Sequence, residues 1–158
     1  MKKILILEDN LYTAEDMIEE ISYALKKRNV NDIDVVALNS IDEANEWVKN
    51  MDVNELLCLI ADLNMNPAGL TEEEKQKTNG AVLTGWVWIN CHIRSKSELK
   101  DLKVIFYSAF IHRLKEDDEF KSMNGNERKN VILISKNEYG MENLCKELIK
   151  ITKGRNLI

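Results

Sequence analysis

Short hydrophobic runs alternate with longer amphipathic segments along this chain. The runs at residues 4–7, 56–61, 104–107 and 131–134 are almost continuously aliphatic, as in strands that are covered on both faces of a sheet. A weaker run at 34–37 is flanked by polar residues, which predicts an outer strand of the same sheet. We therefore predict five strands and place the four continuous runs at the centre.

The segments between these runs have the spacing of amphipathic helices. In residues 11–27, for example, Met17, Ile21 and Leu25 recur at four-residue intervals among glutamates and lysines. Helices are predicted at residues 11–27, 41–51, 81–94, 110 to about 121, and 141–152. Alternation of strand and helix predicts a doubly wound parallel α/β sheet, because a parallel crossover needs a helix to return the chain to the same edge.

Composition narrows the class of protein. The 158 residues suit one domain, which we place at residues 1–158, and the formal net charge of −5 opposes binding to a nucleic-acid backbone. Cys58, Cys91 and Cys145 are widely spaced and form no CxxC pair, so we interpret them as reduced, buried packing residues. No uncharged apolar stretch approaches the roughly 20 residues of a membrane-spanning helix. These features predict a cytoplasmic protein without membrane insertion.

One connection is unusually long. Residues 63–79 are mostly polar, hold the only proline, Pro67, and exceed the roughly 2–6 residues of an ordinary strand-to-helix loop. Thr71 and Glu74 have the spacing of a capping box, which predicts a short helix inside this connection. We interpret residues at about 66–79 as an insertion and hypothesise that it forms a lid or a partner-selective surface.

The candidate chemistry lies where the predicted strands end. In an open parallel sheet, ligands bind beyond the carboxyl ends of the strands, and these ends carry Glu8 and Asp9, Asp62, Ser108 and Lys136. Three converging carboxylates repel one another unless a cation compensates them, and oxygen ligands select a hard ion such as Mg²⁺. A fixed ammonium and a hydroxyl suit a transferred phosphoryl group. The nucleophile is then a carboxylate.

Four segments containing these residues resemble the signature motifs of response-regulator receiver domains. They are ILILEDN at 4–10, IADLNM at 60–65, FYSA at 106–109 and ISK at 134–136. Each motif by itself is weak, but the four occur in the family's order, each at the end of a predicted strand. The resemblance implies a flavodoxin-like sheet with strand order 2-1-3-4-5.

The resemblance also implies a role for each candidate residue. Asp62 is expected to be the phosphoacceptor, Ser108 to follow the phosphoryl group, and Lys136 to bind a phosphoryl oxygen and, before phosphorylation, the Asp62 carboxylate. The Mg²⁺ shell is expected to comprise Glu8, Asp9, Asp62 and the backbone carbonyl of Asn64. A histidine kinase or histidine phosphotransfer protein would supply the phosphoryl group, and an unknown effector protein would read it. We expect no output domain and no turnover of an external substrate.

Two departures from the family pattern favour an alternative. Asn137 stands where receivers usually have a proline that permits a cis peptide bond, and Leu133 replaces the usual aromatic switch residue. A receiver-like protein-binding module that acts without phosphorylation therefore remains a second hypothesis. A third, an aspartyl-phosphate hydrolase of the haloacid-dehalogenase type, is disfavoured because Asn64 stands where that family has a second aspartate.

Aromatic and histidine residues receive no functional role from the sequence. Trp86 and Trp88 are two positions apart in a predicted helix, so they point in different directions; we interpret them as packing residues and expect at least one to be partly exposed. His92 and His112 lack acidic or cysteine ligands at metal-binding spacing, which predicts ordinary surface or helix positions.

Overall fold

Five parallel strands form one sheet in the order β2-β1-β3-β4-β5 in the computed structural model, which describes residues 1–156. The strands are β1 (Lys2–Leu7), β2 (Ile33–Leu38), β3 (Leu56–Ala61), β4 (Lys103–Ser108) and β5 (Val131–Ser135). The predicted strand positions, the fold class and the outer position of β2 are confirmed.

The prediction that residues 131–134 form a central strand is wrong. β5 is the edge strand opposite β2 and, within residues 1–156, pairs only with β4. Its aliphatic character has another cause, because helices cover both of its faces: Val131 packs into the core on one side of the sheet and Ile134 into the core on the other. An edge strand covered on both faces is as apolar in sequence as a central one.

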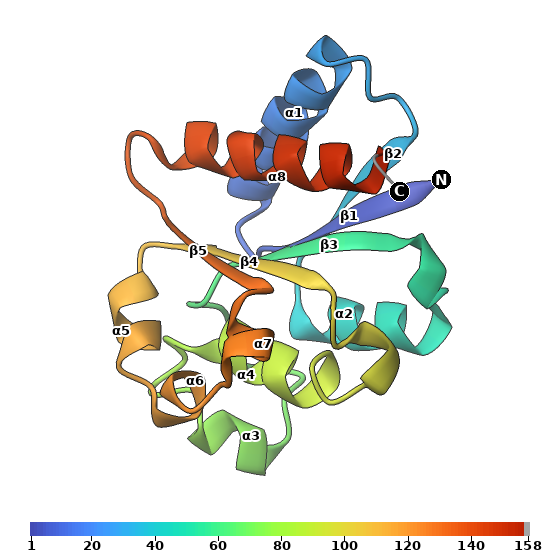
Figure 1. The fold of residues 1–158 in the computed structure, drawn as a ribbon. Helices are drawn as coiled ribbons and strands as arrows, with labels where there is room; N and C mark the ends of the chain where they lie inside the picture. The colour runs from blue at the N-terminus through green and yellow to red at the C-terminus, as the bar shows by residue number, and fades with distance from the viewer. Residues whose placement is uncertain (157–158) are drawn as a thin grey trace.

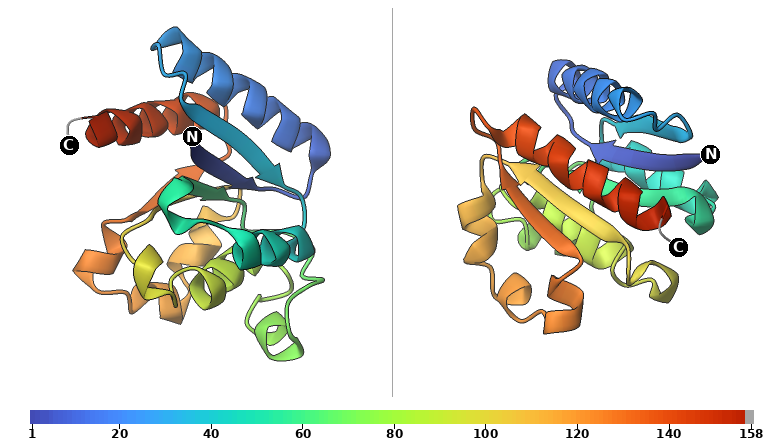
Figure 2. Two further views of the ribbon diagram at one scale, coloured as in Figure 1. Left: turned by 90° about the vertical axis from the view of Figure 1, so that its right-hand side faces the viewer. Right: turned by 45° about the horizontal axis from the view of Figure 1, so that its top comes forward.

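Helices cover both faces of the sheet (Figure 1). One face carries α1 (Leu11–Lys27) and α8 (Gly140–Asn156), which contact each other. The other face carries α2 (Ile41–Asn50), α4 (Thr84–His92), α5 (Ile111–Lys115), α6 (Asp118–Lys121) and α7 (Gly125–Arg128). Two 3-10 turns, η1 (Val53–Glu55) and η2 (Ser97–Leu99), precede β3 and β4. The views in Figure 2 show the same three layers from other sides.

Alternating strand residues divide the apolar core into two clusters. In β1, Ile4 and Ile6 face α1 and α8, whereas Leu5 and Leu7 face α2 and α4. Both sets are almost fully buried, because a parallel sheet between two helical layers leaves neither face to solvent. This double coverage explains the unbroken hydrophobicity of the strand sequences.

The region predicted as one helix at 110–121 contains two short helices. The break comes at Asp117, whose Oδ2 accepts hydrogen bonds from the backbone N–H of Phe120 at 3.0 Å and from Trp86 Nε1 at 3.1 Å. A carboxylate that caps a new helix ends the previous one at the same point. Helix α7 was not predicted, although Asn124 caps it by accepting from the Glu127 N–H at 2.8 Å.

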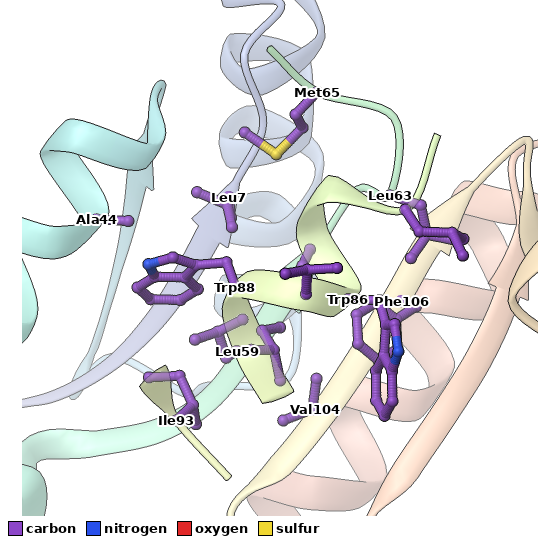
Figure 3. Packing of buried hydrophobic residues seen from close by; sticks show 14 of the residues in the cluster. Leu7, Ala44, Leu59, Leu63, Met65, Trp86, Trp88, Ile93, Val104 and Phe106 are labelled. Carbon is purple, nitrogen blue, oxygen red and sulfur yellow. The ribbon is translucent and has the colours of Figure 1, made fainter. Parts of the chain in front are cut away.

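Both tryptophans of α4 are buried, which corrects the expectation that one is partly exposed. Trp86 and Trp88 are each 1% exposed (Figure 3). Trp86 packs edge-on against Phe106, with ring centroids 6.0 Å apart, whereas Trp88 donates through Nε1 to Asn45 Oδ1 of α2 at 2.8 Å. Helix α4 packs on the sheet and has other helices on both sides. Side chains that leave α4 in two different directions are therefore both buried.

The predicted insertion is packed on the helical layer. Helix α3 (Glu72–Gln76) begins with the expected capping box of Thr71, and it lies beyond α4, away from the sheet (Figures 1 and 2). The Gly69 carbonyl accepts from Asn45 Nδ2 at 3.1 Å, and Glu74 pairs with His92 at 2.8 Å. His92 therefore makes a part-buried hydrogen bond with Glu74, and the insertion is anchored to both α2 and α4.

Replacing Asn45 with alanine is expected to lower the free energy of unfolding by about 1–3 kcal/mol, because the buried Trp88 indole N–H loses its acceptor. Urea unfolding followed by tryptophan fluorescence measures the change. Asn50→Ala, at an exposed position of the same helix, is the matched control and should change it by less than about 0.5 kcal/mol. Equal unfolding midpoints for the two variants would contradict the prediction.

The cysteines are only partly as expected. All three are free, and Cys58 is fully buried, which raises the pKa of its thiol to about 12. Cys91 and Cys145 are partly buried and pack against the two core clusters, so the predicted packing role is confirmed but complete burial is not. Within residues 1–156, none of the helices has the length and apolar character needed to cross a membrane.

Candidate functional site

The carboxyl ends of the strands bring the predicted residues to one edge of the sheet. Backbone hydrogen bonds hold this edge together beyond the last strand pairs. The N–H of Glu8 donates to the carbonyl of Leu38 at 3.1 Å, and the N–H of Asp62 donates to the carbonyl of Leu7 at 3.0 Å. The N–H of Lys136 likewise donates to the Ser108 carbonyl at 3.0 Å. The side chains of Glu8, Asp62 and Lys136 therefore start from fixed backbone positions.

The Lys136 ammonium joins two of the candidate carboxylates. Its Nζ lies 2.6 Å from Glu8 Oε1 and 2.9 Å from Asp62 Oδ2. The other oxygen of Asp62, Oδ1, accepts from the backbone N–H of Leu63 at 2.7 Å. The structure thus places Glu8, Asp62 and Lys136 together, as expected.

Glu8 is the buried acid of this group, with 2% of its surface exposed. Burial raises the pKa of its carboxyl, the hydrogen bond from Lys136 opposes this, and the negative charge of Asp62 adds to it, so the pKa is raised overall. A nearby positive charge therefore stabilises the ionised form of this buried carboxyl strongly.

Lys136 reaches both acids without the proline that usually follows it in receivers. The Lys136–Asn137 peptide bond is trans, and the Asn137 side chain accepts from the backbone N–H of Tyr139 at 3.0 Å. Burial by itself lowers the pKa of the Lys136 ammonium, but the hydrogen bond to Glu8 and the charge of Asp62 outweigh it and raise the pKa. The ammonium is therefore held in its charged form.

The other predicted residues lie beside this group but have different partners. Asp9 Oδ2 accepts from the backbone N–H of Asn66 at 3.0 Å, which ties the start of the insertion to the site. Ser108 is fully buried, and its Oγ accepts from the backbone N–H of Phe110 at 3.1 Å. Asn64 lies exposed in the loop after β3. Ser108 is therefore turned toward its own loop and not hydrogen-bonded to Asp62.

Comparison with known proteins relates this arrangement to a fold. The sequence matches no protein-family profile and no curated protein. Two solved structures align over nearly the whole of both chains. A sensor protein from Polaromonas sp. JS666 has a TM-score of 0.63 and 17% identity, covering 97% of each chain. The receiver domain of the Francisella response regulator 1452 has a TM-score of 0.56 and 16% identity, covering 98% of this chain and 99% of that one.

The chain has the receiver-domain fold. The strand order, the full-length alignment and the flanking helices all agree with it. At these identities the similarity establishes the architecture alone, so the chemistry must be argued from the residues themselves.

The oxygen atoms at this edge of the receiver fold are of the kind that bind a hard divalent cation. Three carboxylates, Glu8, Asp9 and Asp62, stand against the single ammonium of Lys136, which leaves two negative charges uncompensated. All the donors are oxygens, as Mg²⁺ requires. Within the part of the chain that the structure describes, three acidic side chains do not gather closely enough to hold an ion, and Asp9 Oδ2 accepts from the Asn66 N–H.

Two residues of the site were not predicted. Asn39 donates through Nδ2 to the Glu8 carbonyl at 3.0 Å, and the Tyr107 ring lies under the Lys136 ammonium, 5.5 Å from ring centroid to Nζ. Asn39 directly follows β2, so reading the carboxyl end of this strand along with the others would have found it. Tyr107 carries no such signal, because its contact with Lys136 depends on the direction of a side chain.

Proposed function

We propose that this protein is a phosphoryl-accepting response-regulator receiver, with Asp62 as the acceptor. The observation that carries the proposal is the Lys136 ammonium shared between Asp62 and Glu8 at the ligand-binding edge of a receiver fold. An anionic nucleophile beside a fixed positive charge is the arrangement that a transferring phosphoryl group needs.

In the proposed reaction an Asp62 carboxylate oxygen attacks the phosphorus of the donor. The donor is a phosphohistidine of a histidine kinase or phosphotransfer protein, or a small acyl phosphate. The new P–O bond forms as the P–N bond of the histidine, or the P–O bond of the acyl phosphate, breaks, and the leaving group keeps the electron pair. Lys136 compensates the charge on the phosphoryl oxygens.

The carboxylates around Asp62 provide the proposed metal site. Bound Mg²⁺ would shield the charge between the acceptor and the incoming phosphoryl group. Glu8, Asp9, Asp62 and the carbonyl of Asn64 would hold it. Asp9 also accepts from the N–H of Asn66 through Oδ2, so metal binding at Asp9 is expected to alter the beginning of the insertion.

Arrival of the phosphoryl group gives Lys136 a new anionic partner in place of the Asp62 carboxylate. The Ser108 hydroxyl, now held by the N–H of Phe110, would turn toward the new oxygens. These shifts would bias the surface read by an effector protein. The protein would accept and lose its own phosphoryl group without turning over an external substrate, and it would do so in the cytoplasm.

Intact-protein mass measured after incubation with Mg²⁺ and acetyl phosphate tests the proposal. The wild type should gain one phosphoryl group, and Asp62→Asn should gain none. Asp101→Asn, at an exposed turn, is the matched control and should behave like the wild type. The signal should disappear when EDTA removes Mg²⁺. An unmodified wild type, with no binding of beryllium fluoride either, would refute the phosphorylation.

A phosphorylation-independent binding module is the second candidate. It is favoured by the present partner of Ser108, because its hydroxyl accepts from the Phe110 N–H and is turned away from Asp62. Receivers usually have an aromatic residue at the position of Leu133, so the usual coupling between this position and Ser108 is incomplete. This candidate predicts that Asp62→Asn binds the protein's partner as well as the wild type does.

A further inference from the structure

Tyr107 occupies the position just before Ser108 at the end of β4. Since alternate strand residues face opposite sides, its ring enters the core beneath α1 and α8. It stands beside Ile134 of β5 in the register of the sheet, and 7% of its surface is exposed. Tyr107 therefore lies at the carboxyl-terminal edge of the sheet, next to the strand that Lys136 directly follows.

The ring contacts Lys136 through its face. Nζ lies 5.5 Å from the ring centroid, within the roughly 6 Å of a cation–π interaction. The same ammonium contacts Glu8 and Asp62, so two carboxylates and one aromatic face surround it. The charge of Lys136 also lowers the pKa of the Tyr107 phenol, although burial, the larger effect, raises it overall.

Helix α8 fixes the ring from the other side. A Cβ on Gly140, the first residue of this helix, would lie 2.9 Å from Tyr107 Cε1 and 3.1 Å from its hydroxyl oxygen. It would also lie 2.5 Å from the Ser135 carbonyl oxygen. Only glycine permits this approach, so the helix closes tightly over the edge of the ring. The aromatic face is therefore a rigid support.

We propose that Tyr107 is a positioning residue for Lys136. Lysine has a flexible four-carbon stem, and its ammonium is a point charge without a preferred plane. Two carboxylates attract it but do not determine the path of the stem. The packed ring limits that path and keeps the ammonium between Glu8 and Asp62. The contact is made by the ring face, so phenylalanine should replace tyrosine here and leucine should not.

The effect on phosphorylation rests on the proposed function, whereas the contact itself does not. Nuclear magnetic resonance of the protein carrying ¹³C-labelled lysine tests the contact directly. The side-chain methylene protons of Lys136, assigned by their absence in Lys136→Met, should be shifted upfield by the ring. The shift should persist in Tyr107→Phe and disappear in Tyr107→Leu. An unchanged shift in Tyr107→Leu would overturn the proposal.

The rate of phosphorylation by acetyl phosphate tests the consequence. Tyr107→Leu should react about threefold to tenfold more slowly than the wild type, and Tyr107→Phe within about twofold of it. Tyr139→Leu, which alters an exposed tyrosine, is the matched control and should react like the wild type. A folded Tyr107→Leu that reacts at the wild-type rate would overturn the positioning role. If the wild type itself is not phosphorylated, the proposed function fails. The Lys136 methylene shift then decides by itself whether Tyr107 positions Lys136.

A reciprocal measurement covers the case in which Tyr107→Leu does not fold. With ¹³C-labelled tyrosine, the ring signals of Tyr107 are assigned by their absence in Tyr107→Phe. Lys136→Met should move these signals, whereas Lys146→Met, on the exposed face of α8, should not. Unchanged chemical shifts of the Tyr107 ring in Lys136→Met would overturn the proposal.

Discussion

Gly85→Ala is expected to lower the free energy of unfolding by about 3 kcal/mol or more. Gly85 lies in the first turn of α4, where its N–H donates to the Leu63 carbonyl at 3.0 Å. An added Cβ would collide with the carbonyl oxygen of Asp62, and it would lie 3.0 Å from the Asp62 carbonyl carbon. These are backbone atoms that cannot rotate away. The helix must therefore move off the loop that carries Asp62.

Urea unfolding of the two proteins measures this loss. The matched control is Gly154→Ala in α8, where a Cβ meets nothing within 4 Å. This control should stabilise the protein by up to about 1 kcal/mol, because alanine has the higher helix propensity. Opposite signs for the same substitution in two helices would isolate the collision. A Gly85→Ala variant as stable as the wild type would contradict it.

Lys136→Met is expected to lower the free energy of unfolding by about 2 kcal/mol near neutral pH in the absence of Mg²⁺. The substitution leaves Glu8 buried next to Asp62 with no cation. Loss of one partner of a buried pair costs about 3–5 kcal/mol, and we discount this because the Lys136 side chain is 24% exposed. It should also slow phosphorylation sharply, because the positive charge beside Asp62 is lost.

The loss should depend on pH in a defined direction. Without Lys136, burial and the charge of Asp62 raise the pKa of Glu8, and only the smaller effect of the Asn10 N–H opposes them. A group whose pKa is raised in the folded protein gives most stability below its ordinary value of 4.5 and loses it as pH rises through the raised value. The deficit of Lys136→Met relative to the wild type should therefore shrink as the pH falls toward the ordinary value of 4.5.

The wild type should show the complementary behaviour at high pH. The pKa of Lys136 is raised from 10.5 in the folded protein, so its stabilising contribution is complete below that value and is lost as pH rises through the raised one. Urea unfolding at several pH values measures both trends. Lys146→Met, which breaks an exposed pair with Glu142, is the control and should change stability by less than about 0.5 kcal/mol at any of them. A deficit independent of pH would contradict the role of Glu8.

The pattern of the sequence was sufficient for most of the architecture. Residues 11–27 and 56–61 were predicted as helix and strand with the boundaries that α1 and β3 have. Both segments are marked by local features: apolar spacing on one face of a helix, and continuous burial in a strand. The capping box at Thr71 was likewise visible in sequence, because it involves residues only three positions apart.

Errors arose where burial depends on neighbours from distant parts of the chain. Trp86 and Trp88 point in different directions, yet α6 covers Trp86 and α2 covers Trp88, and periodicity within one helix contains no information about those neighbours. The division of residues 110–121 into two helices depends on Asp117, which also binds the Trp86 indole.

For the candidate site, the sequence by itself determined which residues stand at the strand ends, because strand order and parallel direction bring those ends to one edge. It thereby identified Glu8, Asp62 and Lys136 as neighbours. Only the tertiary structure decided the partner of each polar atom: Lys136 with both acids and the Tyr107 ring, and Asp9 with the insertion. Such pairings depend on side-chain directions and distances of a few ångströms, which packing sets and residue spacing does not.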